Sequence, residues 1–304
     1  VPINLVDMVM GDTKLCPYDA GTWGSLTTRF ADPVLRAAAA EAREILFDLA
    51  STKLGVSEAS LKLDNGVIYD AENPLNKATY AELTKGKKIV KNLEKKPDIK
   101  RASEFKLIGK PIISTDAIAK VTGTAMYSGD IKLPGMVYAT VVRPKIVGSK
   151  KLSVNASQLE SFSGVELIND GDLVAVVHSD PEISLKAAKK VKVTWDAPEQ
   201  KMDNETIFKY LEENISDNNT FQEGGSLEEG NTTSKSVLKA QYQDGYKAHA
   251  PMETHSATCY FENDKLTIWT STQTPFGTQD QLAKALEIPK ENVHVKQIFL
   301  GGGF

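Results

Sequence analysis

Three consecutive glycines near the end of the chain, in Gly301-Gly302-Gly303-Phe304, form the first pattern that could contact a ligand. They follow an apolar run directly. Glycine accepts positive φ and lets backbone amides approach a ligand closely, as in an anion-binding nest. A flexible tail would explain the same residues equally well, so this pattern does not decide alone.

A second pattern, Ser271-Thr272-Gln273-Thr274-Pro275, stands where an apolar run gives way to a helical pattern. The Gln273 side chain offers both a hydrogen-bond donor and an acceptor. It would lie beside the first amides of a helix, which favour anions. Ordinary helix capping by Thr274 is the alternative, and this stretch on its own favours capping.

Residues 249–255 form a third pattern, because His249, Glu253 and His255 are residue types that ligate metals. Their spacing differs from the His-Glu-x-x-His motif of zinc enzymes. Pro251 also opposes the helix that this motif needs. We therefore predict no metal ligands here and expect a structural turn with a partly buried, hydrogen-bonded glutamate.

The fourth pattern lies in residues 21–28, Gly-Thr-Trp-Gly-Ser-Leu-Thr-Thr, just before a strongly helical stretch. Small residues and hydroxyl groups ahead of a helix could hold a phosphate or pyrophosphate. Gly24, Ser25 and Thr27 are the candidates. Taken alone, a capping loop is the simpler explanation, so no single pattern establishes a function.

The composition is that of a globular chain with room for two domains, or for one large domain with an insertion. The 304 residues are 41% hydrophobic and 25% charged, with a formal net charge of -4. No broad basic field attracts nucleic acid or anionic lipid. No apolar run is long enough to span a bilayer, and no signal peptide is visible. Val1 is not a natural start, so we expect the true N-terminus to lie upstream.

The two cysteines, Cys16 and Cys259, are far apart, and neither belongs to a Cys-x-x-Cys pair. The chain therefore carries no iron–sulfur or zinc motif of its own. We expect two buried thiols, with a disulfide between them as the alternative.

Periodicity predicts a short strand over residues 1–9 and a helix over residues 33–54. Asp32 would cap this helix, Pro33 suits its first turn and Gly55 suits its end.

A hairpin and a connecting arm follow the helix. Asn65-Gly66, between alternating apolar residues, indicates the hairpin. Residues 83–103 are rich in lysine and lack periodicity, which indicates the arm. The only basic cluster of the chain lies here, and we interpret it as a solvated linker or helix face.

The downstream half alternates strands and helices, with a polar loop predicted over residues 215–235. Asp180 and Asn204 would cap helices, and Asn263-Asp264 would form a tight turn. Strands are predicted over residues 137–143, 174–178, 191–195, 237–243, 256–262, 266–272 and 293–299, and helices over residues 181–190, 205–214 and 275–286.

The four patterns occur together with their spacers, and in this arrangement the chain resembles the molybdopterin-binding large subunit of the xanthine dehydrogenase and aldehyde oxidoreductase family. The likeness covers nearly the whole chain. It is strongest to the beta subunits of isoquinoline 1-oxidoreductases, in which a Gly-Thr-x-Gly-Ser loop and an Ala-rich helix come first. Further residues resemble the opening of the family's α/β hammerhead domain: Phe105-Lys106-Leu107-Ile108-Gly109-Lys110-Pro111, Asp116, Lys120-Val121-Thr122-Gly123, Ala125, Tyr127, Asp130 and Leu133-Pro134-Gly135-Met136.

This resemblance implies an α+β fold of several domains. A hammerhead domain would span residues 103–198. Parts of molybdopterin-cofactor-binding domains would flank it, at residues 1–100 and, truncated, at residues 201–304.

The resemblance also implies a molybdopterin cytosine dinucleotide that carries molybdenum. Gln273 would hydrogen-bond an oxo ligand of the metal, and the backbone at Phe304 would lie beside the metal. Leu26 departs from the residue that many relatives carry in their pterin loop. The implied cofactor contacts are Gln273, Gly302, Gly303, Phe304, Gly24, Ser25 and Thr27.

Three parts of the family pattern are absent. A Gly-Gln-Gly loop is expected upstream of Val1, another glycine is expected after Phe304, and the catalytic glutamate that acts as general base is expected far downstream. No glutamate in the chain matches that motif, so we assign no catalytic residue. We expect a piece of the subunit that is inactive on its own.

The implied parent enzyme oxidises an aldehyde or an N-heteroaromatic ring with oxygen from water. Electrons would pass to [2Fe–2S] clusters on a small partner subunit, because two cysteines cannot ligate even one cluster. The bacterial cytoplasm and the periplasm are both open as compartments. One alternative is a cofactor-free relative that serves as a binding or scaffold module. Another is a nucleotide-binding protein, although no Walker-type Lys-Ser/Thr follows the glycines.

Overall fold

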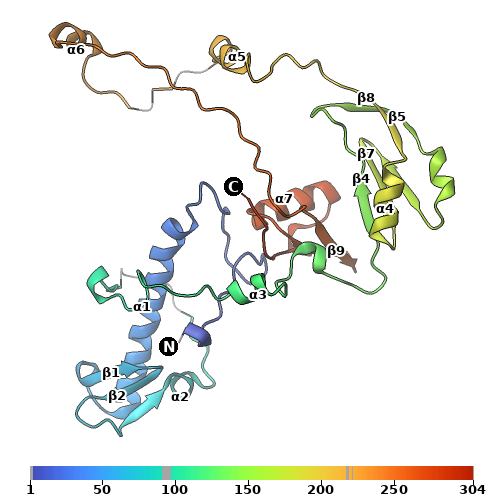
Figure 1. The fold of residues 1–304 in the computed structure, drawn as a ribbon. Coiled ribbons are helices and arrows are strands. Elements are labelled where there is room, and N and C mark those ends of the chain that lie inside the picture. Colours follow the sequence, from blue (N-terminus) through green and yellow to red (C-terminus); the bar gives the residue numbers. More distant parts are fainter. Residues whose placement is uncertain (1–2, 91–96, 217–218, 221, 304) are drawn as a thin grey trace. The chain divides into compact units, whose positions relative to one another are not determined.

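A computed structural model describes residues 3–90, 97–216, 219–220 and 222–303 (Figure 1). The chain divides into two compact units. Unit 1 comprises Val1–Ile131 and His249–Phe304, and unit 2 comprises Lys132–Ala248. Both units contain helices and antiparallel strands, which confirms the predicted α+β class.

Unit 1 contains a long helix, α1 (Thr27–Leu54), which begins ahead of the predicted start at Pro33. Pro33 lies inside the helix, where it removes only one backbone hydrogen bond. Asp32 does not cap the helix, and its carboxylate instead lies 3.7 Å from the guanidinium of Arg36. The predicted end is confirmed, since Gly55 adopts φ 68° and its N–H donates to the Ser51 carbonyl.

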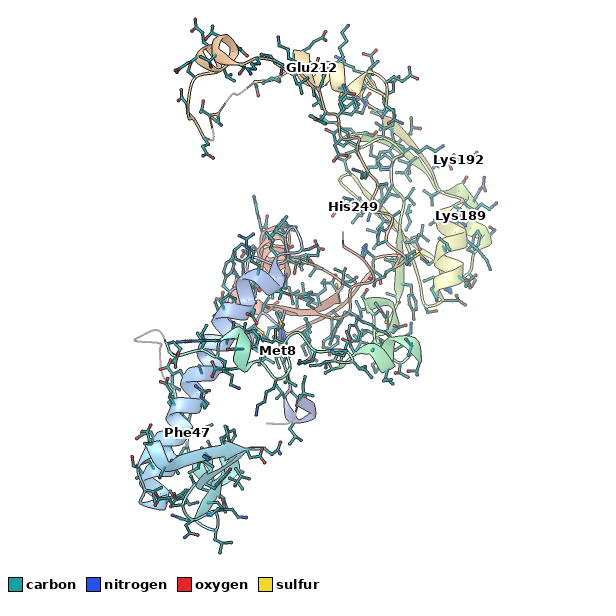
Figure 2. All side chains as sticks on the ribbon, turned by 60° about the vertical axis from the view of Figure 1, so that its left-hand side comes forward. Met8, Phe47, Lys189, Lys192, Glu212 and His249 are labelled. Atoms are coloured by element: carbon teal, nitrogen blue, oxygen red, sulfur yellow. The ribbon has the colours of Figure 1, made fainter. Side chains whose placement is uncertain are left out.

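A three-stranded antiparallel sheet packs on the C-terminal half of α1. Its strands are β1 (Leu61–Asp64), β2 (Val67–Asp70) and β3 (Lys77–Thr79), and α2 (Tyr80–Thr84) follows. Asn65 and Gly66 both adopt positive φ, which confirms the predicted hairpin. Ala50 and Ile68 are fully buried in the shared core, and Phe47 of α1 packs against it (Figure 2).

The second sheet of unit 1 is built around a β-α-β crossover. Its strands are β9 (Ala257–Glu262), β10 (Lys265–Thr270) and β11 (Val293–Gln297), and α7 (Pro275–Leu286) connects the last two. β9 and β10 are antiparallel across the predicted Asn263-Asp264 turn, whereas β10 and β11 are parallel. Ala283 of α7 packs on Ile268 and Val295, so the helix covers one face of the sheet (Figure 1).

The described residues 3–9 do not form the strand predicted over residues 1–9, of which residues 1–2 lie outside the description. Residues 3–9 begin with a 3₁₀ turn, η1 (Ile3–Leu5), and continue without a regular element. The side chains of Leu5, Met8 and Val9 are exposed, because no neighbouring strand within the described residues pairs with this segment (Figure 2). Pairing begins later, where Asp12 forms an antiparallel bridge with Lys296 of β11.

Unit 2 contains two small antiparallel sheets and a helix. The first sheet has the order β4-β7-β6, the second pairs β5 with β8, and Val174 and Val176 lie fully buried beside α4. Asp180 caps α4 as predicted and accepts from the Glu182 N–H. The elements are β4 (Tyr138–Val141), β5 (Lys150–Asn155), β6 (Glu166–Asp170), β7 (Leu173–His178), α4 (Pro181–Ala188) and β8 (Lys192–Asp196).

Three predictions for the rest of unit 2 are wrong. Helix α5 (Ile207–Glu213) is preceded not by an Asn204 cap but by Asp203, whose carboxylate accepts two backbone N–H groups. Helix α6 (Leu227–Thr233) lies within the predicted loop, because Ser226 caps it. Residues 237–243 form no strand, since their side chains are exposed and no strand among the described residues pairs with them.

The predicted arm and the cysteines also have clear outcomes. Of the arm predicted over residues 83–103, residues 85–90 and 97–101 contain no helix or strand, whereas Leu83 and Thr84 belong to α2 and residues 102–103 to a 3₁₀ turn; residues 91–96 lie outside the description. Both cysteines are free. Cys16 is half-buried, but Cys259 is exposed on β9, so the prediction of two buried thiols is wrong.

Short elements complete the described part of the chain, in which no helix has both the length and the apolar character to cross a membrane. They are η2 (Glu58–Ser60), η3 (Ala102–Glu104), α3 (Ala117–Val121), η4 (Ser128–Asp130), η5 (Ser157–Ser161) and η6 (Lys290–Asn292).

Replacing Ile68 by alanine is expected to lower the free energy of unfolding by about 2–5 kcal/mol, because it leaves a cavity in the core under α1. Ile113 is 77% exposed and provides the matched control, with an expected loss within about 0.5 kcal/mol. Urea unfolding followed by circular dichroism measures both. Equal losses in the two variants would contradict this assignment of the core.

Candidate functional site

The candidate site lies where β10 and β11 end. Parallel strands end at the same edge of a sheet, and ligands of open α/β sheets bind at this edge. Residues 271–274 leave β10 and lead into α7, while residues 298–303 leave β11. The Ile298 N–H donates to the Thr270 carbonyl at 3.4 Å, so the two segments run side by side as they leave the sheet.

Gln273 lies in contact with the glycine segment. A Cβ built on Gly303 would overlap the Oε1 of Gln273 and would come within 2.6 Å of its Cδ. Only glycine therefore fits at position 303 without moving the Gln273 amide. Gly302 adopts φ 127°, a conformation that side chains rarely permit. The candidate Phe304 lies outside the described residues.

The loop before α1 also reaches Gln273. The Thr22 N–H donates to the Gln273 carbonyl at 2.9 Å, and Gln273 Nε2 donates to the Thr22 carbonyl at 3.5 Å. Gly21 has φ 102°, and a Cβ there would overlap the Gln273 carbonyl oxygen. The hydroxyl groups of Thr22 and Thr27 lie 2.8 Å apart. Thr22, which the sequence patterns did not single out, therefore connects the candidate Thr27 to the candidate Gln273.

The candidates Gly24 and Ser25 form an exposed turn beside this contact. Both have positive φ, at 55° and 58°. Within the described residues their backbone N–H groups have no acceptor, and the first turn of α1 has no side-chain cap. Unpaired amides at the start of a 28-residue helix suit an anionic group such as a phosphate. No described contact joins Gly24 or Ser25 directly to Gln273 or Gly303.

Glu253 holds the start of the glycine segment. The Gly301 N–H donates to Glu253 Oε2 at 2.7 Å, and the Ser271 hydroxyl donates to Glu253 Oε1 at 3.1 Å. The Glu253 side chain is only 12% exposed, which confirms the predicted partly buried, hydrogen-bonded glutamate, and residues 252–253 form a bend. His249 is exposed (Figure 2). In the described part of the chain, no group of three or more His, Cys, Asp or Glu residues is arranged to hold a metal ion.

Capping does not account for residues 271–275. Thr274 occupies the N-cap position of α7, but its side chain makes no capping hydrogen bond. Instead the Thr272 hydroxyl accepts from the Thr274 N–H at 3.2 Å and lies 3.1 Å from the Thr278 hydroxyl. These contacts fix the turn, and the Gln273 amide lies between Thr22 and Gly303.

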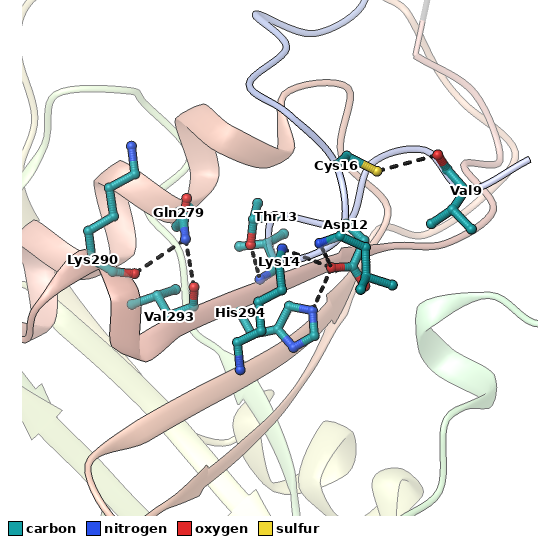
Figure 3. A network of polar contacts seen from close by, with 11 residues as sticks. Val9, Asp12, Thr13, Lys14, Cys16, Gln279, Lys290, Val293 and His294 are labelled. Carbon is teal, nitrogen blue, oxygen red and sulfur yellow. Dashed lines mark hydrogen bonds and ion pairs between the residues drawn. The ribbon is translucent and has the colours of Figure 1, made fainter. Parts of the chain in front are cut away.

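A partly buried polar network fastens the N-terminal segment to β11, next to the site (Figure 3). Asp12 Oδ1 lies 2.8 Å from His294 Nε2 and accepts the N–H groups of Lys14 and Leu15. Thr13 completes the pairing, since its hydroxyl accepts from the Val295 N–H at 3.0 Å. Burial alone would raise the pKa of Asp12, but the hydrogen bonds outweigh it and hold the pKa below its ordinary value of 3.8.

All four sequence patterns therefore meet at one edge of one sheet. The segments are residues 21–27, 253–255, 271–274 and 301–303. They offer a side-chain amide, unpaired backbone amides and hydroxyl groups, with close approach of the backbone at the glycines. This set suits a ligand that carries polar oxygens and phosphate.

Comparison with known proteins gives consistent family matches. Two families described as a molybdopterin cofactor-binding domain match the sequence, one over residues 1–126 and one over residues 211–304. A nicotinate dehydrogenase subunit of Pseudomonas putida is 26% identical over 99% of this chain and 26% of its own length. The xanthine dehydrogenase molybdenum-binding subunit of Escherichia coli O157:H7 is 28% identical over 62% of this chain and 31% of its own length.

A solved structure shares the fold. Quinoline 2-oxidoreductase from Pseudomonas putida 86 superposes with a TM-score of 0.50 at 21% identity, covering 64% of this chain and 31% of that chain. The chain thus spans roughly a quarter to a third of these relatives.

Replacing Gly303 by alanine is expected to displace the Gln273 amide and to lower the free energy of unfolding by about 1–3 kcal/mol, because the new Cβ needs the space of Oε1. A crystal structure of the variant and urea unfolding test this. Gly245 is the control, since a Cβ there meets nothing within 4 Å. An unmoved Gln273 in a Gly303→Ala protein as stable as Gly245→Ala would refute the contact.

Replacing Asp12 by alanine is expected to cost about 1–3 kcal/mol at pH 7, because it removes the acceptor of a partly buried network. The pKa of Asp12 is lower in the folded protein than 3.8, so its contribution is complete above pH 3.8 and is lost as the pH falls through the folded value. Urea unfolding between pH 7 and pH 3 should show the gap to wild type narrowing only at the acidic end. The exposed Asp48→Ala is the control, and a gap that widens on acidification would contradict the assignment.

Proposed function

Because this chain belongs to the family of molybdopterin-binding large subunits of xanthine dehydrogenases and aldehyde oxidoreductases, we propose that it forms part of the cofactor site of a molybdenum hydroxylase. One observation carries this proposal. The Gln273 loop, the glycine segment and the loop before α1 converge at the edge where β10 and β11 end. The convergence joins residues that are about 250 positions apart in the sequence.

The residues present fit a molybdopterin cofactor. When bound, the cofactor supplies the redox chemistry, while protein groups position and polarise it. The Gln273 amide would donate to an oxygen ligand of the metal, and the backbone of Gly302 and Gly303 would contact the cofactor, while Phe304 stays a predicted contact. Gly24, Ser25 and Thr27 would hold the pterin end through backbone amides and a hydroxyl group. The unpaired N–H groups of Gly24 and Ser25 support this assignment.

The general base of the reaction comes from outside this chain. Glu253 is the glutamate that lies at the site, and both of its carboxylate oxygens already accept hydrogen bonds. A general base must lie within hydrogen-bond reach of the proton that it removes, whereas the Glu253 carboxylate is engaged with Ser271 and Gly301. We therefore expect this chain alone to have no catalytic activity, and the full-length parent protein to convert substrate.

The parent enzyme oxidises an aldehyde or an N-heteroaromatic ring and passes electrons to [2Fe–2S] clusters of a small partner subunit. Relatives named nicotinate dehydrogenase and aldehyde oxidase support these two substrate classes. The two cysteines of this chain are too few for a cluster, which supports a separate carrier. The cofactor is the cytosine dinucleotide form.

The full-length parent, produced with its partner subunit, tests the proposal. Elemental analysis should find molybdenum in roughly equal molar amount to the protein, and acid should release a cytosine nucleotide. Gln273→Ala should lower kcat/KM about 10–100-fold, whereas the exposed Gln158→Ala should not change it. A well-folded protein without molybdenum or nucleotide, from a host that makes the cofactor, would instead indicate a cofactor-free scaffold relative.

A further inference from the structure

Glu253 is a nearly buried acidic residue that the proposed chemistry does not use. Its side chain is 12% exposed and accepts hydrogen bonds from two different segments of the chain. An acidic side chain in such a place costs desolvation unless its oxygens are satisfied. Both oxygens accept hydrogen bonds here, so the carboxylate serves to hold Ser271 and Gly301 in place.

The contact between Glu253 and Gly301 is reciprocal. The Gly301 N–H donates to the carboxylate at 2.7 Å, and the Glu253 N–H donates to the Gly301 carbonyl at 3.3 Å. A Cβ built on Gly301 would overlap the Cβ of Glu253. The glycine segment is therefore held on both of its backbone groups, at a distance that only glycine permits.

The same carboxylate also holds the Gln273 loop. Its Oε1 accepts from the Ser271 hydroxyl at 3.1 Å, and Ser271 precedes Gln273 by two residues. Gly301, on Oε2, precedes Gly303 by two residues. Glu253 thus holds both segments. In each, the held residue lies two positions before the contact between Gln273 and Gly303.

His255 lies beside the carboxylate and the Ser271 hydroxyl. Its Nδ1 lies 3.4 Å from Glu253 Oε2 and 3.3 Å from the Ser271 hydroxyl. The imidazole is 42% exposed, whereas the Glu253 side chain is 12% exposed. A hydrogen bond shielded from water is stronger than an exposed one, so the contacts of the nearly buried Glu253 carboxylate restrain both segments.

We propose that Glu253 is a positioning residue that sets the spacing between Gln273 and the Gly301–Gly303 segment, and through it the fit of the cofactor. This inference rests on the proposed function for its ligand. Glu253 acts through Ser271 and Gly301, because no described contact joins its side chain to Gln273 or Gly303. It neither donates nor removes a proton in the reaction.

Four variants of the full-length protein, with its partner subunit, test this role. Glu253→Ala should speed hydrogen exchange of residues 301–303 about tenfold or more and reduce bound molybdenum at least tenfold. Glu253→Gln should stay within about threefold of wild type for both, because its amide can accept from Gly301 and donate to Ser271. Ser271→Ala should show a smaller effect, since the Gly301 contact remains. Glu291→Ala, an exposed glutamate of the same unit, should change neither readout.

A double variant separates positioning from general stability. Glu253→Ala with Ser271→Ala should lose no more molybdenum than Glu253→Ala alone, because Ser271 acts through the missing carboxylate. The inference is overturned if the hydrogen-exchange rates of residues 301–303 and the amount of bound molybdenum in Glu253→Ala both stay within twofold of wild type. If Glu253→Ala does not fold, Ser271→Ala decides: exchange of residues 301–303 equal to that of Glu291→Ala overturns the inference.

Failure of the proposed function can be distinguished from failure of the inference about Glu253. Wild-type protein without molybdenum refutes the cofactor assignment, whereas the exchange measurements still decide whether Glu253 positions the glycine segment.

Discussion

Parallel strands cannot be joined by a tight turn, and the crossover through α7 is the constraint from which the site follows. It brings the ends of β10 and β11 to one edge of the sheet. Gln273 leaves that edge from one strand, and Gly303 reaches it from the other. The buried contacts of Ala283 with Ile268 and Val295 keep the crossover in place. Hydrophobic packing on one face of the sheet thus fixes polar groups at its end.

Close approach of backbone to side chain is the second requirement of this site. Gly21, Gly301 and Gly303 each meet a neighbour where a Cβ would overlap it. Glycine loses more conformational freedom on folding than other residues, so each such contact needs a partner that offsets this cost. Glu253 supplies hydrogen bonds at Gly301, and Thr22 supplies them beside Gly21. The glycines therefore belong to a hydrogen-bonded structure, which distinguishes them from a flexible tail.

Some local signals predicted local structure correctly, whereas the caps predicted at Asp32 and Asn204 are wrong. Asn65-Gly66, Asp180 and Gly55 each determine a turn, a cap or a helix end through their own backbone or side chain. No comparable signal in the sequence indicates which distant segments pair with one another. The bridge between Asp12 and β11 joins residues more than 280 positions apart, and residues 237–243 alternate like a strand but pair with no strand of the described chain. At the site, the patterns identified the segments, whereas the contacts of Thr22 and Glu253 depend on the tertiary fold.

Unit 1 is built from both ends of the sequence, and this sets the order in which it can form during translation. Asp12 and Thr22 leave the ribosome long before their partners exist. At about 5–20 residues per second, the 282 residues between Asp12 and His294 take roughly 15–55 s to synthesise. Unit 2, which is continuous, can fold in this interval. The edge of β10 and β11 is completed only afterwards, so any ligand of this site is acquired by a chain that has already passed residue 303.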